Sequence, residues 1–98
     1  MKSAQEIVRD INDHITKEGS GYKNWYCGVT ENPKQRLFEE HHVAQEGGWW
    51  IYNECASDTV ARTIEQHFLD LGCKGHGGGG DDDARYVYAY KITANTRE

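Results

Sequence analysis

Residues 85–93 read Arg-Tyr-Val-Tyr-Ala-Tyr-Lys-Ile-Thr, a strongly strand-like stretch. Side chains of an extended strand point alternately to its two faces. One face therefore carries four large side chains, those of Tyr86, Tyr88, Tyr90 and Ile92. The other face carries Val87, Ala89 and Lys91. This alternation predicts a last strand with a strongly aromatic face.

Three helices are expected before this strand. The first covers residues 3–17, where apolar side chains recur at helical spacing behind a capping box. The second begins at Asn32-Pro33, because Asn caps a helix well and Pro fits its first position. The third begins at Ser57 or Asp58 and ends at Gly72, with an apolar stripe along its length.

Two further strands lie between these helices. Residues 25–29 and 49–55 have the aromatic and β-branched bias typical of strands. The predicted order is therefore αβαβαβ with short elements. A chain of 98 residues has room for one modest hydrophobic core. We therefore expect a single α+β domain spanning residues 1–98.

Composition limits the classes of function. The chain has three cysteines, Cys27, Cys55 and Cys73, and no secretory leader, so we expect reduced thiols and a cytoplasmic location. No apolar run approaches the roughly 20 residues of a membrane span. The net charge of −5 disfavours an extended basic face for nucleic acid, so any such binding must use a local cluster.

The most specific signal pairs Tyr26-Cys27-Gly28 with Arg36, which follows on the first turn of the second predicted helix. A strand end followed by a helix start gathers a phenol, backbone amides and a guanidinium, a combination that suits a phosphate. The alternative interpretation is that Tyr26 is a core aromatic and Arg36 a solvated helix residue. Short motifs readily mislead, so the alternative is favoured when only these two positions are weighed.

Glu65 and two histidines are the next candidates. Glu65 lies beside the apolar stripe of the third helix, where a partly shielded carboxylate can hold a divalent cation. A glutamate there is more often a surface residue. His41 and His42 follow Arg36, and one of them could face the same phosphate and transfer a proton. Neighbouring helix residues point about 100 degrees apart, so the other is expected to face solvent.

Together these segments resemble the GIY-YIG nuclease family. The matching pieces are residues 25–30, 32–33, 36–37, 41–42 and 61–65. The resemblance implies a small three-stranded antiparallel sheet, here flanked by the three expected helices. It implies that Tyr26 belongs to an active site and that Arg36 steadies the scissile phosphate. It further implies that Glu65 binds one divalent cation, usually Mg²⁺ or else a cation such as Mn²⁺, and that His41 rather than His42 belongs to the site.

One part of the family pattern is missing. The first tripeptide should lie roughly ten residues before Tyr26, but Tyr22 is too close for a hairpin between two strands of about five residues each. The segment 87–93 resembles the family's first strand instead. We therefore predict a circular permutation, in which this last strand lies beside the Tyr26 strand and supplies Tyr90, or less favourably Tyr88. The alternative is an ordinary strand whose tyrosines take no part in chemistry.

The resemblance implies metal-assisted hydrolysis of nucleic-acid phosphodiester bonds, with DNA as the preferred substrate. Tyr26 or Tyr90 would deprotonate or position the attacking water, with help from His41. Arg36 would offset the charge of the transition state, and magnesium on Glu65 would stabilise the departing oxygen. A homodimer is compatible with this chemistry, because cutting two strands in concert needs two single-metal sites.

Two other classes of protein are alternatives for this sequence. A catalytically inactive module of the same scaffold would bind a protein or a nucleic acid as an accessory or inhibitor protein. The acidic charge, the missing N-terminal motif and the pair Trp49-Trp50 support it. A zinc-binding domain around Cys73, His76 and Asp81–Asp83 ranks last, because the sequence lacks the second Cys or His pair of a convincing site.

Overall fold

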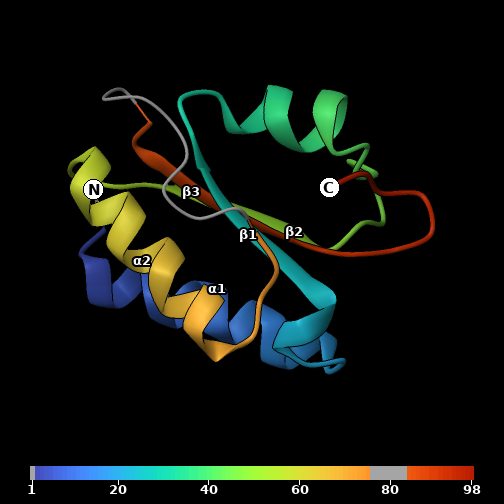
Figure 1. The fold of residues 1–98 in the computed structure, drawn as a ribbon, viewed down its shortest axis with the longest axis horizontal. Coiled ribbons are helices and arrows are strands. Elements are labelled where there is room, and N and C mark those ends of the chain that lie inside the picture. Colours follow the sequence, from blue (N-terminus) through green and yellow to red (C-terminus); the bar gives the residue numbers. More distant parts are fainter. Residues whose placement is uncertain (1, 76–83) are drawn as a thin grey trace.

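The computed structural model describes residues 2–75 and 84–98. It contains a three-stranded antiparallel sheet in the order β1-β3-β2, formed by β1 (Trp25–Thr30), β2 (Trp50–Glu54) and β3 (Tyr86–Lys91). The predicted α+β class and antiparallel sheet are confirmed. The last strand in the sequence is the central strand of the sheet, between the two earlier ones (Figure 1).

The pairing of β1 with β3 confirms that the last strand lies beside the Tyr26 strand. Tyr26 is directly opposite Tyr90, and Gly28 is directly opposite Tyr88. Directly opposite residues of an antiparallel pair place their side chains on the same face. Both tyrosines of β3 therefore share a face of the sheet with Tyr26. That a permutation produced this pairing stays a prediction.

Two helices cover the opposite face of the sheet (Figure 1). The helix α1 (Ala4–Glu18) begins at the predicted capping box, in which Ser3 and Glu6 each accept a hydrogen bond from the other's backbone N–H. It ends at Gly19, whose φ of 92° is in the left-handed region that favours glycine. The helix α2 (Asp58–Leu71) is capped by Ser57.

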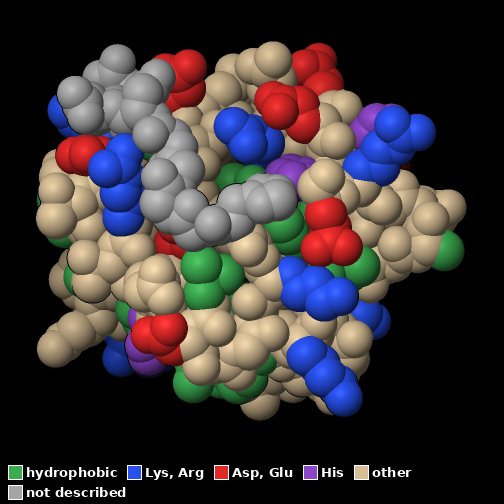
Figure 2. Space-filling view, in the orientation of Figure 1, with side chains coloured by type: hydrophobic (Ala, Val, Ile, Leu, Met, Phe, Trp, Pro, Cys, Tyr) green, Lys and Arg blue, Asp and Glu red, His purple; other side chains and the backbone are tan. Residues whose placement is uncertain are grey.

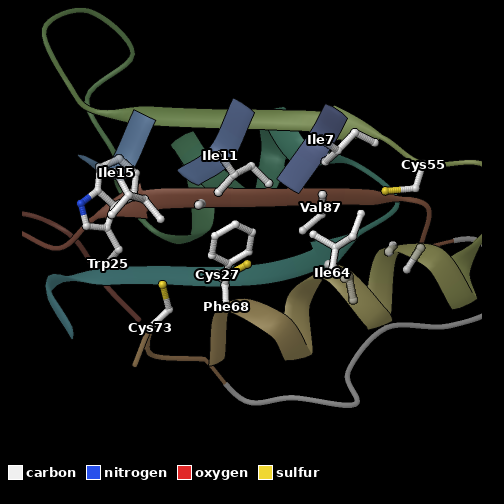
Figure 3. Packing of buried hydrophobic residues seen from close by; sticks show 14 residues of the cluster. Ile7, Ile11, Ile15, Trp25, Cys27, Cys55, Ile64, Phe68, Cys73 and Val87 are labelled. Atoms are coloured by element: carbon white, nitrogen blue, oxygen red, sulfur yellow. The ribbon is translucent and has the colours of Figure 1, made fainter. Parts of the chain in front are cut away.

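The main core lies between these helices and the sheet. Figure 3 shows the isoleucines of α1 pointing toward Val87 and Cys27, with Ile64 and Phe68 of α2 beside them. The fully buried side chains of this layer include Ile7, Ile11, Trp25, Cys27, Cys55, Phe68 and Val87. All three cysteines are buried free thiols, as expected. In the described part of the chain, no helix is both long enough and apolar enough to cross a membrane.

The aromatic face of the sheet is covered by a different kind of helix. The predicted second helix forms, but its main part, η2 (Gln35–Glu40), is a π-helix. The amide of His41 donates to the carbonyl of Arg36 at 2.9 Å, so the turn is one residue wider than in an α-helix. Propensities do not encode this widening, and a short 3₁₀ turn, η1 (Tyr22–Asn24), was likewise not predicted.

The segment after α2 protects the free edge of β1. Gly72, with φ of 119°, ends the helix, and Lys74 then pairs with β1 in parallel. Its carbonyl accepts from the Cys27 amide and its amide donates to the Trp25 carbonyl, both at 2.8 Å. The approach is so close that a Cβ on Gly75 would lie 2.5 Å from the Cys27 carbonyl oxygen. These hydrogen bonds satisfy backbone groups of β1 that would otherwise be unpaired at the edge of the sheet.

Candidate active site

Tyr26 lies at the centre of the predicted site. Its ring is stacked on Tyr90 with centroids 5.2 Å apart and on Tyr88 at 6.3 Å, and the His41 ring lies 4.8 Å away. Only 4% of Tyr26 is exposed. The pairing of β1 with β3 and the wide turn of η2 together bring these four rings into one cluster. Leu37 and Val43 complete its apolar surroundings.

Hydrogen bonds fix the orientation of His41. Its Nδ1 is 2.6 Å from the carbonyl oxygen of Arg97, which can only accept, so Nδ1 carries the proton. In the neutral ring Nε2 is then an acceptor, and the Tyr88 hydroxyl lies 2.8 Å from it. The Tyr90 hydroxyl lies 3.0 Å from Nδ1 and donates to Arg97 at 3.3 Å. His41 therefore holds both β3 tyrosines, and both of its ring nitrogens are occupied by these contacts.

His42 points the other way, as expected for one histidine of the pair. It is exposed and has a φ of 57°, whereas His41 is 5% exposed. This backbone turn separates the two side chains. The sequence could not decide between them, because both lie at the helix end and differ only in the direction of the turn.

Gly28 makes room for Tyr88. An ideal Cβ on Gly28 would lie 2.6 Å from the Tyr88 hydroxyl oxygen. The glycine of the Tyr-x-Gly tripeptide therefore has a packing role here, which is to admit a tyrosine from the neighbouring strand. Burial raises the pKa of Tyr88 far above its usual value, and that of Tyr90 as well. Both phenols thus stay protonated and act as hydrogen-bond donors.

Arg36 lies next to Tyr26 and Tyr88, and its charge favours the phenolate of each. Asn32 accepts from the Gln35 amide with its side chain, which starts the helix that carries Arg36. The buried Nε of Arg36 lies 3.4 Å from a Glu40 carboxylate oxygen and forms an ion pair with it without a hydrogen bond. The Arg36 side chain is 38% exposed, so an anion can reach the guanidinium.

A polar cavity of about 230 Å³ adjoins this guanidinium. It is lined by Thr30, Glu31, Asn32, Gln35, Arg36, Glu40 and Ala84. It is thus formed by the end of β1, the start of the η2 helix and the residue before β3. A phosphate group in this cavity would meet the guanidinium of Arg36 and the carboxylates of Glu31 and Glu40.

Glu65 approaches Tyr26 from α2. The carboxylate is 4% exposed and lies close enough to raise the pKa of both Tyr26 and Cys27. For each group burial is the largest cause of the increase. Tyr26 is therefore flanked by two charges with opposite effects, since Arg36 lowers its pKa and Glu65 raises it. Of the five residues predicted for the site, Tyr26, His41 and Tyr90 are in contact, and Arg36 and Glu65 lie within electrostatic reach of Tyr26.

Glu65 is the carboxylate that the resemblance assigns to a divalent cation. In residues 2–75 and 84–98, no three His, Cys, Asp or Glu side chains gather in a group that could hold a metal. A magnesium ion does not need such a group, because it keeps most of its water ligands and takes one or two carboxylates. Glu65 supplies one carboxylate for this mode, although it does not line the polar cavity beside Arg36.

The zinc alternative rests partly on residues outside the described ranges, namely His76 and Asp81–Asp83. Its remaining member, Cys73, is 6% exposed and packs in the core between the helices and the sheet. Burial raises the pKa of its thiol to about 11. A zinc ligand needs a thiolate, which this environment disfavours.

Two contributors to the site were missed or underrated from the sequence. Tyr88 was the second choice, yet it contacts Gly28 and His41 directly. The backbone of Arg97 anchors His41 through two hydrogen bonds, since its amide also donates to the His41 carbonyl at 2.6 Å. Backbone contacts of this kind leave no signal in a sequence.

Scans of known family models, curated proteins and solved structures found no significant match to this chain. The resemblance to GIY-YIG nucleases therefore depends on the quoted motifs alone.

Proposed function

We propose that this protein is a metal-dependent endonuclease of the GIY-YIG type that hydrolyses phosphodiester bonds in nucleic acid, preferably DNA. The observation that supports the proposal is that Arg36 and Glu65, from two other elements, both act electrostatically on Tyr26 of β1. A phenol, a guanidinium and a shielded carboxylate in one region offer one group for the water, one for the phosphate and one for a cation.

The proposed roles follow from the charge and chemistry of each group. Arg36 would donate to the phosphate and offset the charge that develops in the transition state. Tyr26 would orient the attacking water, because its raised pKa keeps the hydroxyl protonated. Glu65 would hold a divalent cation, whose chemistry is Lewis-acid stabilisation of the departing oxygen.

Tyr90 and His41 would act as positioning residues in this scheme. Their polar atoms already bond to each other, to Tyr88 and to Arg97. They would fix the ring of Tyr26 by stacking against it at 5.2 and 4.8 Å. These roles are more restricted than the sequence-based expectation, in which either Tyr26 or Tyr90 could deprotonate or position the attacking water.

The charge distribution agrees with a local anion site. Figure 2 shows basic and acidic side chains interspersed on the face in view, without an extended basic stripe. Affinity for nucleic acid would then be modest, and a homodimer would supply a second site for the second strand. A cytoplasmic setting is part of the proposal, supported by the three free thiols.

A plasmid-nicking assay tests this function. With Mg²⁺ or Mn²⁺ present, Arg36→Ala and Glu65→Gln should each lower the nicking rate by about 100-fold or more. Arg62→Ala is the matched control, because the Arg62 side chain is 37% exposed and paired with Asp58 four residues away, whereas Arg36 is 38% exposed and paired with Glu40. Circular dichroism would confirm that each variant is folded.

Retained nicking in both variants, or equal loss in the Arg62→Ala control, would exclude this site. A folded wild-type protein that never nicks DNA with either cation would reject the enzyme. The same scaffold acting as a binding module would then be the better explanation.

A further inference from the structure

A second set of aromatic side chains continues the face that holds the proposed active site. We name the set the aromatic strip, and it consists of Phe38, Trp50, Tyr52 and Tyr86. Neighbouring ring centroids are 5.1, 6.0 and 6.1 Å apart along this order. Trp50 and Tyr52 are nearly parallel, with an interplanar angle of 11°. The contacts run from the η2 helix across the edge strand β2 to the start of β3.

The strip is continuous with the cluster around Tyr26. On β2, Trp50 is directly opposite Tyr90 and Tyr52 is directly opposite Tyr88, so these rings share one face. At the end of the sheet, Tyr86 is opposite Thr30, which lines the polar cavity beside Arg36. Both ends of the strip therefore lead to the site.

The rings of the strip are less buried than those of the site. Tyr88 and Tyr90 are at most 1% exposed and their hydroxyls are hydrogen bonded. Trp50, Tyr52 and Tyr86 are only partly buried. The hydroxyls of Tyr52 and Tyr86 have no hydrogen bond to any described residue. Part of each ring therefore reaches solvent, although Phe38, Trp50 and Tyr52 also pack against the cluster around Tyr26.

The exposed ring faces select the ligand of the strip. Glu54 ends β2 beside Tyr86, Glu31 and Glu40 line the adjoining cavity, and the chain carries a net charge of −5. These charges oppose the phosphates of any nucleic acid, so the affinity has to come from the rings. A duplex conceals the faces of its bases, whereas an unpaired strand exposes them for stacking on aromatic side chains.

We propose that the aromatic strip binds the unpaired bases of a single-stranded nucleic acid and leads that strand to Arg36. The proposal rests on the proposed function for the fate of the bound strand, since it names unpaired nucleic acid as the substrate class. The binding itself does not require metal or catalysis. Affinity that comes mainly from stacking should depend only weakly on salt.

The test measures binding with metal removed. The probe is a fluorescein-labelled oligothymidylate of about 12 nucleotides, in EDTA, followed by fluorescence anisotropy. An abasic oligonucleotide of the same length keeps the phosphates without the bases, and a hairpin duplex keeps the bases paired. We expect both to bind about tenfold more weakly than oligothymidylate.

Variants locate the binding surface. Tyr52→Thr and Tyr86→Thr keep a strand-forming residue but lose the ring, and each should weaken oligothymidylate binding about tenfold. Tyr52→Phe and Tyr86→Phe keep the ring and should bind like the wild type. Trp49→Thr is the control, because Trp49 is 38% exposed and packs against His14 of α1, away from the strip.

The outcomes separate this proposal from the proposed function. Oligothymidylate binding that is lost in the Thr variants supports the strip even if the protein never cleaves DNA. Equal binding of the abasic strand, unchanged binding in both Thr variants, or no binding of oligothymidylate at all would overturn it. Metal-dependent nicking of duplex DNA that ignores Tyr52→Thr would also overturn it, while leaving the nuclease intact.

Discussion

The contact between Gly28 and Tyr88 gives a quantitative prediction about stability. In Gly28→Ala, the new Cβ would lie 2.6 Å from the Tyr88 hydroxyl oxygen and 2.7 Å from its Cζ. Cβ atoms do not approach other heavy atoms so closely, so the ring must shift. Tyr88 has little room to do so, because it is 1% exposed and is hydrogen bonded to His41 at 2.8 Å.

The expected cost is about 2 kcal/mol. Overpacking a dense core costs about 1–3 kcal/mol, and weakening a buried hydrogen bond adds about 1 kcal/mol. Replacing glycine stiffens the unfolded chain, which returns about 0.4–1 kcal/mol. For a domain of this size, a loss of about 2 kcal/mol lowers the melting temperature by roughly 10 °C.

Urea denaturation followed by circular dichroism measures this cost. The decisive comparison repeats Gly28→Ala in a Tyr88→Leu background, where the clashing ring is gone. There the same substitution should be nearly neutral, giving a coupling free energy of about 1–2 kcal/mol between the two positions. An equal loss of stability from Gly28→Ala in both backgrounds would refute the explanation that Gly28 makes room for the Tyr88 ring.

Two further predictions concern stability and pH. Glu18 accepts hydrogen bonds from Trp25 and Lys91 at 3.0 and 2.9 Å and from Ser20, which together lower its pKa from 4.5 to about 2 despite the opposing effect of burial. A lowered pKa stabilises the fold above pH 4.5 and loses that effect as the pH falls toward 2. Glu18→Gln should therefore cost about 2 kcal/mol at pH 7 and much less near pH 2, as measured by urea denaturation, and a cost that does not change with pH would contradict this. His41→Leu leaves the buried Tyr88 hydroxyl without its acceptor and should cost about 2 kcal/mol in thermal melts, whereas the control His42→Asn at an exposed left-handed position should stay within about 0.5 kcal/mol; equal effects would contradict the assigned roles.

The sequence predicted those parts of the fold that local signals encode. The capping box at Ser3 and the glycine at position 72 set the ends of their helices as expected. The alternation in residues 86–91 identified β3 and its aromatic face. The widened turn at His41 is local, but propensities do not encode it. The pairing of Lys74 with β1 could not be predicted, because it joins segments distant in sequence.

The candidate site was predictable to a similar extent. The motifs nominated Tyr26, Arg36 and Glu65, and pairing of the last strand with the first brought Tyr90 next to Tyr26. The hydrogen bonds of His41 were not predictable, since they involve the hydroxyl of Tyr88 and the backbone carbonyl of Arg97, both distant in sequence. The aromatic strip also went unrecognised, because its members come from three elements and no spacing rule connects them.

The central position of β3 has a consequence for how the chain folds. In the described sheet the strands β1 and β2 are both neighbours of β3 and not of each other, although both precede it in the sequence. Forming the sheet thus requires closing long loops before any ladder bond is gained, a topology associated with slow folding. During synthesis, the helices can form as they emerge, but both earlier strands must wait for the residues that supply the tyrosines. Assembly of the sheet and completion of the cluster around Tyr26 are then the same late event.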